Sequence, residues 1–134
     1  MLKVLILAGK DWQTMLQHVI RCAPLEACGL LAGKGKRVEI VLPMQNAAQS
    51  AVRFRLDPQE QWRAFQHIEA HGWELVGIYH SHPQGPTHLS PRDIIEAMYP
   101  VVNILWWWQE DNWHAGGFWI ENREVSEVAL QVDG

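Results

Sequence analysis

The chain has 134 residues, of which 48% are apolar and 19% charged, an ordinary globular balance with enough residues for one buried core. Its net charge of −4 lacks the basic surface that nucleic acids require, so we expect no nucleic-acid partner. No apolar run approaches the roughly 20 residues of a membrane span, and no signal peptide is visible. We therefore expect a single cytoplasmic domain over residues 1–134 with no membrane partner. Cys22 and Cys28 are too few for a disulfide framework, so we expect reduced, mostly buried thiols.

The first segments of the chain predict a strand followed by a helix. An apolar run over residues 2–8 is typical of a strand covered on both faces. Asp11 is a suitable cap for a helix that ends before Pro24. Apolar residues recur along this helix at helical spacing, so we expect one stripe to face the core, formed by Trp12, Met15, Leu16, Val19 and Ile20.

The next segments predict a hairpin and an isolated strand. Two apolar runs over residues 28–32 and 38–42 are separated by a glycine-rich turn at 33–36, as in a β-hairpin. Residues 52–56 alternate between apolar and charged side chains, which predicts a half-exposed strand.

The middle of the chain predicts a well-capped helix and a central strand. Asp57 is placed to cap the helix, with Pro58 at its first position and Glu60 at its third. We expect this helix to run to about His71, with three residues facing inward: Trp62, Phe65 and Ile68. Residues 73–79 follow as the central strand.

The last third predicts one more helix and three strands, which completes an α/β fold. The helix begins near Ser90 and is stopped by Pro100, and we expect it to bury Ile94, Ile95 and Met98. The strands cover residues 101–108, 114–121 and 124–132. Strands alternating with helices predict a mixed sheet flanked by about three helices.

The stretch from His80 to Asp93 contains side chains in a pattern that predicts a metal site. His80 and His82 follow the central strand, and residues two apart on a strand point to the same side. Asp93, in the first turn of the helix that starts at Ser90, returns a carboxylate to the same place. Two histidines, one carboxylate and an open position make up a catalytic zinc site. Each residue alone has an ordinary interpretation, as a core histidine or a helix cap, but their convergence at one end of a sheet favours a metal site.

Two motifs in the sequence resemble those of the JAMM (MPN-plus) zinc metalloproteases, in their small prokaryotic stand-alone form. Residues 76–83 read Val-Gly-Ile-Tyr-His-Ser-His-Pro; six residues then separate Pro83 from Ser90, and two residues separate Ser90 from Asp93. Upstream, residues 24–31 read Pro-Leu-Glu-Ala-Cys-Gly-Leu-Leu. The resemblance implies the MPN architecture, which is similar to that of the cytidine deaminases.

The resemblance also implies a role for five residues. His80, His82 and Asp93 correspond to the ligands of one zinc ion per chain, with water at the fourth position. Glu26 corresponds to the general acid/base, and Ser90 to the residue that steadies the tetrahedral intermediate. Without this resemblance, nothing in the sequence would identify Glu26 as a catalytic residue, because taken alone it is a surface glutamate after a proline.

The implied function is cleavage after the terminal Gly-Gly of a ubiquitin-like protein, and small relatives of this type process ubiquitin-like sulfur carriers. The chain has no room for the large insertions that recognise a second ubiquitin in eukaryotic relatives. A non-catalytic MPN-type scaffold is the alternative, and the intact set of five residues argues against it. Zinc deaminase chemistry is excluded because it needs a C-x-x-C pair that this sequence lacks.

Several other features carry weaker expectations. We expect Trp106, Trp107 and Trp108 to pack in the core, with an aromatic wall for a substrate tail or a dimer contact as the alternative, which leaves a homodimer open. We expect His88 to face solvent and Ser81 to point away from the two histidines as a structural residue.

Two loops are candidate walls of a substrate groove. They are the polar segment over residues 45–51 and the loop over residues 84–89. An extended tail could pair by main-chain hydrogen bonds with a sheet edge beside them.

Overall fold

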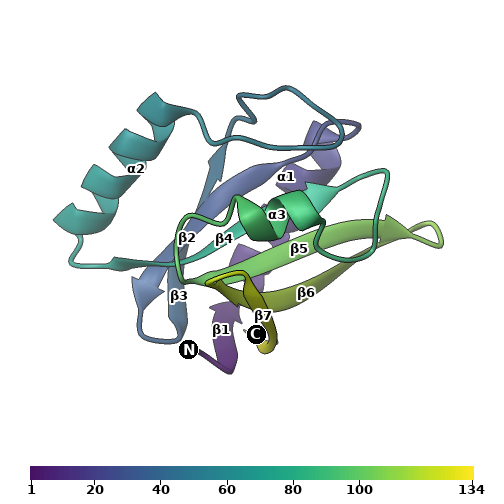
Figure 1. Ribbon diagram of the computed structural model, residues 1–134. Coiled ribbons are helices and arrows are strands. Elements are labelled where there is room, and N and C mark those ends of the chain that lie inside the picture. Colours follow the sequence, from purple (N-terminus) through teal and green to yellow (C-terminus); the bar gives the residue numbers. More distant parts are fainter.

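The chain forms seven strands and three helices in the computed structural model, which describes residues 1–134 (Figure 1). The strands are β1 (Val4–Ala8), β2 (Cys28–Lys34), β3 (Arg37–Met44), β4 (Glu74–His82), β5 (Val102–Gln109), β6 (Asn112–Glu121) and β7 (Glu124–Asp133). The helices are α1 (Gly9–Cys22), α2 (Pro58–Ala70) and α3 (Pro91–Ile95). The predicted order of elements is therefore confirmed apart from one strand, over residues 52–56.

All seven strands belong to one sheet, which closes into a barrel in the order β1-β3-β2-β4-β5-β6-β7. The closing contact is parallel and joins β1 to β7, with Val4 opposite Ala129 and Ala8 opposite Asp133. β4 and β5 also run parallel, while β2 pairs antiparallel with both β3 and β4. The mixed sheet with three helices is confirmed, but its closure is not predicted by the sequence, because an apolar pattern does not specify which strands become neighbours.

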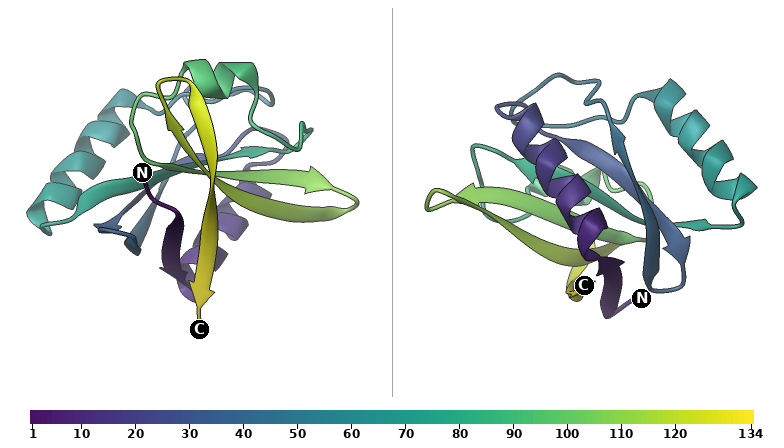
Figure 2. Two further views of the ribbon diagram at one scale, coloured as in Figure 1. Left: turned by 60° about the horizontal axis from the view of Figure 1, so that its bottom comes forward. Right: turned by 180° about the vertical axis from the view of Figure 1, so that it is seen from behind.

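Helices α1 and α2 cover opposite faces of the same strands, which explains the continuous apolar runs of the sequence. On one face, Leu31 of β2 packs in a large cluster with Met15 of α1. On the other face, Leu30 and Ile78 pack with Ala64 of α2. Figure 2 shows α1 lying along the barrel while α2 stands at the other side of β2 and β3.

Helix α1 begins three residues earlier than predicted, at Gly9. Ala8 is its N-cap residue and provides no side-chain cap, so the prediction that Asp11 caps the helix is wrong; Asp11 lies inside the first turn and is buried. Ile20 is largely exposed, because it lies about 100° around the helix from Val19 and beyond the face that contacts the barrel. The rest of the inward stripe is confirmed, with two buried members and two that pack against the core from its rim: Met15, Val19, Trp12 and Leu16.

Helix α2 begins as predicted, since the Asp57 side chain accepts a hydrogen bond from the Glu60 N–H at 3.4 Å. Its inward face is different from the predicted one. Trp62 is exposed, and the residues that are buried are Ala64 and Ile68, with Phe65 half-buried.

The predicted strand over residues 52–56 does not form. It belongs to the segment between β3 and α2, residues 45–57, which we call the β3–α2 loop. Its only ladder contact is an isolated bridge between Asn46 and Leu56. The alternating pattern has another cause: Phe54 and Leu56 pack against the core, while Arg53 and Arg55 face solvent.

Helix α3 is shorter than predicted and ends at Ile95, well before Pro100. Ile94 packs against a small core cluster as expected, but Ile95 is exposed and Met98 is 77% exposed. A helix of five residues presents too little surface to bury three apolar side chains, so the other two remain in solvent.

None of the three helices has the length and apolar character needed to cross a membrane. Cys22 and Cys28 are both free thiols, and Cys28 is buried, in agreement with the expectation for them.

A buried hydrogen bond links α1 to β4 and generates a prediction about stability. His18 Nδ1 lies 2.7 Å from the Tyr79 hydroxyl in the core. Burial, together with the positive charge of Arg21, lowers the pKa of His18. Below about pH 6.5 the unfolded chain therefore binds a proton that the folded chain resists, and stability declines as the pH falls.

We expect the unfolding free energy to fall between pH 6.5 and 5.5 by up to about 1 kcal/mol more in the wild type than in His18→Asn. Asparagine keeps a polar partner for the tyrosine hydroxyl but does not titrate. Urea unfolding at the two pH values measures the difference, and parallel pH profiles for the two proteins would contradict it.

Candidate active site

Strand β4 carries both predicted histidines to one point. The strand extends to His82, so His80 and His82 both lie within it and share one face. Their side chains are 1% and 2% exposed, respectively. Their ring centroids are 5.0 Å apart. The strand is held between β2 and β5, with His80 opposite Cys28 on one side and Leu105 on the other.

Glu26 reaches the same point from the segment that precedes β2. The Ala27 N–H donates to Ser81 Oγ at 2.8 Å, and the Ser81 N–H donates to the Ala27 carbonyl at 3.1 Å. These two hydrogen bonds join Ala27, which follows Glu26, to Ser81, which lies between the two histidines. Ser81 thus points away from the histidines and has a structural role, as expected.

Asp93 and Ser90 come from the start of α3, where they form a capping box. The Asp93 N–H donates to Ser90 Oγ at 3.1 Å, and the Ser90 N–H donates to Asp93 Oδ2 at 2.8 Å. This same carboxylate oxygen lies 3.2 Å from His80 Nε2 and 3.1 Å from His82 Nε2. Ser90 Oγ is used as an acceptor, so its hydroxyl proton is free for another partner.

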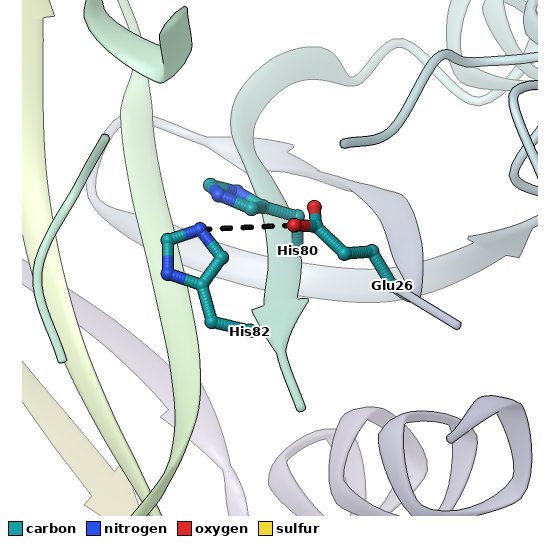
Figure 3. Close-up of side chains that lie close together, drawn as sticks. All are labelled: Glu26, His80 and His82. Atoms are coloured by element: carbon teal, nitrogen blue, oxygen red, sulfur yellow. Dashed lines mark ion pairs between the residues drawn. The ribbon is translucent and has the colours of Figure 1, made fainter. Parts of the chain in front are cut away.

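Four of the five predicted site residues therefore meet directly, and the fifth is one hydrogen bond away. Glu26, His80 and His82 have ligand atoms within 4.8 Å of one another, and Glu26 Oε2 lies 4.0 Å from His82 Nε2. Figure 3 shows the carboxylate of Glu26 directed at the rings of the two histidines.

The protonation of these groups follows from burial and their mutual contacts. Burial raises the pKa of Glu26 to about 8, against the attraction of His82. Burial also lowers the pKa of His80. For Asp93, burial is outweighed by its close contacts with the rings of His80 and His82, so its pKa is lowered. For His82, burial is outweighed by the bonds to Asp93 and the Pro86 carbonyl, so its pKa is raised.

The donor atoms fit a divalent metal ion. Both ring nitrogens of His80 and Oε1 of Glu26 are buried without a hydrogen-bond partner, which is costly unless something else satisfies them. His82 Nδ1 lies 2.9 Å from the Pro86 carbonyl, which fixes that nitrogen as the donor to the loop and leaves Nε2, 3.1 Å from Asp93 Oδ2, as the nitrogen available to a metal ion. Two imidazoles and a carboxylate around an open position suit zinc.

Phe54 is a site residue that the sequence did not identify. Its ring stacks on the imidazole of His80 with a centroid distance of 4.6 Å and an interplanar angle of 23°. The alternation of residues 52–56 signals that Phe54 packs inward, but it gives no indication of the partner.

A hollow of about 290 Å³ lies beside His80 and Asp93. Its walls are the second half of the β3–α2 loop, residues 53–56, and the segment from Arg92 to Tyr99. Neither of the predicted groove walls, residues 45–51 and 84–89, borders this hollow, because the β3–α2 loop folds so that its second half faces His80.

The other expectations have mixed outcomes. His88 is exposed, as predicted. Trp106 is buried against Trp12, with ring centroids 4.7 Å apart, and Trp107 packs against a smaller cluster. Trp108 is 42% exposed, so the expectation of core packing fails for the last tryptophan of the three.

Comparison with known proteins identifies one family. Residues 10–124 match the family model Prok-JAB, described as prokaryotic homologs of the JAB domain. A solved structure, the solution structure of protein DSY2949 from Desulfitobacterium hafniense, has a TM-score of 0.86 at 32% identity and covers 97% of this chain and 93% of that one.

Three curated relatives are named as a conjugate-cleaving protease, a desampylase and a peptidase. A probable TtuB-protein conjugate cleaving protease of Thermus thermophilus is 43% identical over 66% of this chain, and the match spans 60% of that relative's length. A desampylase of Pyrococcus furiosus is 33% identical over 86% of this chain and 81% of its own. A CysO-cysteine peptidase of Mycobacterium tuberculosis is 36% identical over 76% of this chain and 71% of its own.

The geometry generates a prediction about metal binding. We expect the purified protein to bind about one zinc ion per chain, and His82→Ala to lose it, because the variant removes one of two buried imidazoles. His88→Ala is the matched control, since this exposed histidine lies in the same loop outside the site. Elemental analysis after dialysis measures the ratio. Equal zinc content in His82→Ala and the wild type would refute the assignment.

Proposed function

The chain belongs to the family of prokaryotic homologs of the JAB domain, and we propose that it is a zinc metallopeptidase that cleaves after the terminal Gly-Gly of a ubiquitin-like protein. The observation that carries the proposal is the buried cluster of Glu26, His80 and His82, completed by Asp93. The relatives named as conjugate-cleaving protease, desampylase and CysO-cysteine peptidase support this substrate class.

In this proposal His80, His82 and Asp93 hold one zinc ion. When bound, zinc supplies a Lewis acid that makes water nucleophilic at neutral pH. The remaining steps belong to the protein. Glu26 takes a proton from the attacking water and delivers it to the leaving amine, and its raised pKa suits a group that must both accept and release a proton. The free hydroxyl proton of Ser90 is available to stabilise the oxyanion.

The hollow beside His80 is the proposed site for the substrate tail. It has an apolar floor that includes Phe54 and Ile78, with charged groups at its rim. Strand β4, which carries the two histidines, is paired on both sides, by β2 and by β5, so it offers no free edge for a substrate strand at the site. The extended second half of the β3–α2 loop, residues 53–56, is therefore the backbone beside which a Gly-Gly tail would lie.

A second hollow, of about 610 Å³, is the proposed site for the leaving group. It is lined by Trp108 and Trp113 together with Pro24 and Pro83. No site residue lines this hollow, but Pro24 lies two residues before Glu26 and Pro83 directly follows His82, so two of its lining residues are chain neighbours of site residues. We therefore favour an aromatic wall over a contact between two copies of the chain as the role of Trp108.

Three finer assignments complete the proposal. The substrate is a ubiquitin-like sulfur carrier, the chain acts as one domain over residues 1–134, and the protein is cytoplasmic, where free thiols such as Cys22 and Cys28 persist. A non-catalytic scaffold is the alternative. A scaffold that binds no metal would gain nothing from buried nitrogen and oxygen atoms without hydrogen-bond partners. The presence of such atoms in His80 and Glu26 therefore argues against this alternative.

The proton carrier gives a direct test of the mechanism. We expect Glu26→Gln to lower kcat by about 10²- to 10⁴-fold while zinc content stays at the wild-type value, since glutamine cannot carry the proton. Glu69→Gln, at an exposed glutamate on α2, should leave kcat unchanged. A Glu26→Gln variant with bound zinc and normal turnover would show that the mechanism is wrong.

A panel of substrates tests the reaction itself. The zinc-loaded protein is incubated with ubiquitin-like proteins that carry extra residues after Gly-Gly, or a lysine-linked partner there. We expect mass spectrometry to find at least one product that ends at Gly-Gly, and a chelator to abolish it. Absence of cleavage across the panel, or cleavage only elsewhere, would overturn the proposed substrate class and leave the metal site standing.

A further inference from the structure

Asn46, in the β3–α2 loop, has a side-chain amide that makes four hydrogen bonds within that loop and one to the backbone of Glu26. Its Nδ2 group lies 2.9 Å from the Arg53 carbonyl, 3.1 Å from the Glu26 carbonyl and 3.3 Å from the Ser50 carbonyl. Its Oδ1 atom accepts from two N–H groups of the loop, those of Ala48 and Arg55. A primary amide has two donors and one double acceptor, so every polar position of this side chain is used.

These bonds fix the backbone of Glu26 on both sides. The Glu26 carbonyl accepts from Asn46, and the Glu26 N–H donates at 2.9 Å to the Ser50 carbonyl, which Asn46 also contacts. The Glu26 carboxylate has no comparable support, because Oε1 has no partner and Oε2 is 4.0 Å from His82. The position of the carboxylate is therefore determined mainly by its backbone.

The same amide holds the wall of the hollow. Asn46 binds the residues on both sides of Phe54, through the Arg53 carbonyl and the Arg55 N–H. Phe54 in turn stacks on His80. One side chain thus sets the distance between the Glu26 segment and the loop that covers the metal-binding histidine.

We propose that Asn46 is a positioning residue that holds Glu26 and Phe54 in register across the active site. The proposal rests on the function proposed above. Asn46 touches neither metal ligand nor reacting atoms, so it acts through Glu26 and the loop. Since a misplacement of about 1 Å at a reacting group can cost about 100-fold in rate, loss of these bonds should affect turnover more than folding.

Two variants separate the hydrogen bonds that Asn46 donates from those that it accepts. Asn46→Asp retains an acceptor for the Ala48 and Arg55 N–H groups but cannot donate to the carbonyls of Glu26, Ser50 and Arg53. Asn46→Ala removes all the bonds and introduces no charge. We expect both to lower kcat by about 10- to 100-fold, with zinc content at the wild-type ratio because the ligands are untouched.

The control for lost stability is Val128→Ala on β7, which opens space in the core away from the site. Thermal unfolding of each zinc-loaded variant identifies a temperature at which all are folded, and kinetics are measured there. If Val128→Ala has a similar fall in Tm but normal kcat, the losses in the Asn46 variants come from positioning. If kcat is unchanged in both Asn46 variants, the proposal is wrong. It is also wrong if Val128→Ala, with a similar fall in Tm, loses as much kcat as the Asn46 variants do.

A double variant tests whether Asn46 acts through Glu26. In the Glu26→Gln background, Asn46→Ala should lower the residual rate by clearly less than it does in the wild type, because Glu26, one of the two groups that Asn46 positions, has already lost its function. A full additional 10- to 100-fold loss would mean that Asn46 does not act through Glu26, and would overturn the proposal.

One readout does not depend on the activity. Hydrogen exchange of the Glu26 amide should become faster in Asn46→Asp, while amides of β5 and β6 keep their wild-type rates. If the wild type cleaves no substrate, the proposed function fails, and this measurement still decides the role of Asn46. An unchanged exchange rate at Glu26 would refute it.

Discussion

The register between β2 and β4 is the constraint on which the site depends. Ala27 and Ser81 are 54 positions apart in the chain, yet two hydrogen bonds join them directly. Because side chains alternate along a strand, a slip of one residue would turn His80 and His82 away from Glu26 and exchange the faces covered by α1 and α2. The burial of both faces makes such a slip expensive, so the core that stabilises the fold also fixes the distance between proton carrier and imidazoles.

Asp93 shows how the chain combines a local and a distant role in one group. One oxygen of this carboxylate accepts from the Ser90 N–H and also contacts both imidazoles. A helix start favours a negative charge, and so does a metal site, so the two demands require the same ionised form. The short helix α3 is thereby anchored at its first turn, which is why it holds a site residue in place although it buries little apolar surface.

The parts of the structure that were predictable from sequence are those determined locally. Because side chains alternate along a strand, His80 and His82 lie on the same side of any strand that contains them, and the helix caps at Asp57 and Ser90 depend on residues three apart. Glu26 could be assigned only through the resemblance to a family, because its partners lie on β4. The contact of Phe54 with His80 and the closure of the barrel depend on distant pairings, which no local pattern encodes.

The parallel pair of β1 and β7 links the order of folding to the order of synthesis. Val4 pairs with Ala129, so the barrel can close only when nearly the whole chain is present. Loop-closure entropy makes such distant pairing slow. The part of the sheet around β2 and β4, with the histidines and Glu26, can form from residues that are synthesised earlier. Until β7 is added, the sheet stays open and has two exposed edges. The growing chain is thus most prone to aggregation just before β7 is added, and closure removes both edges in one step.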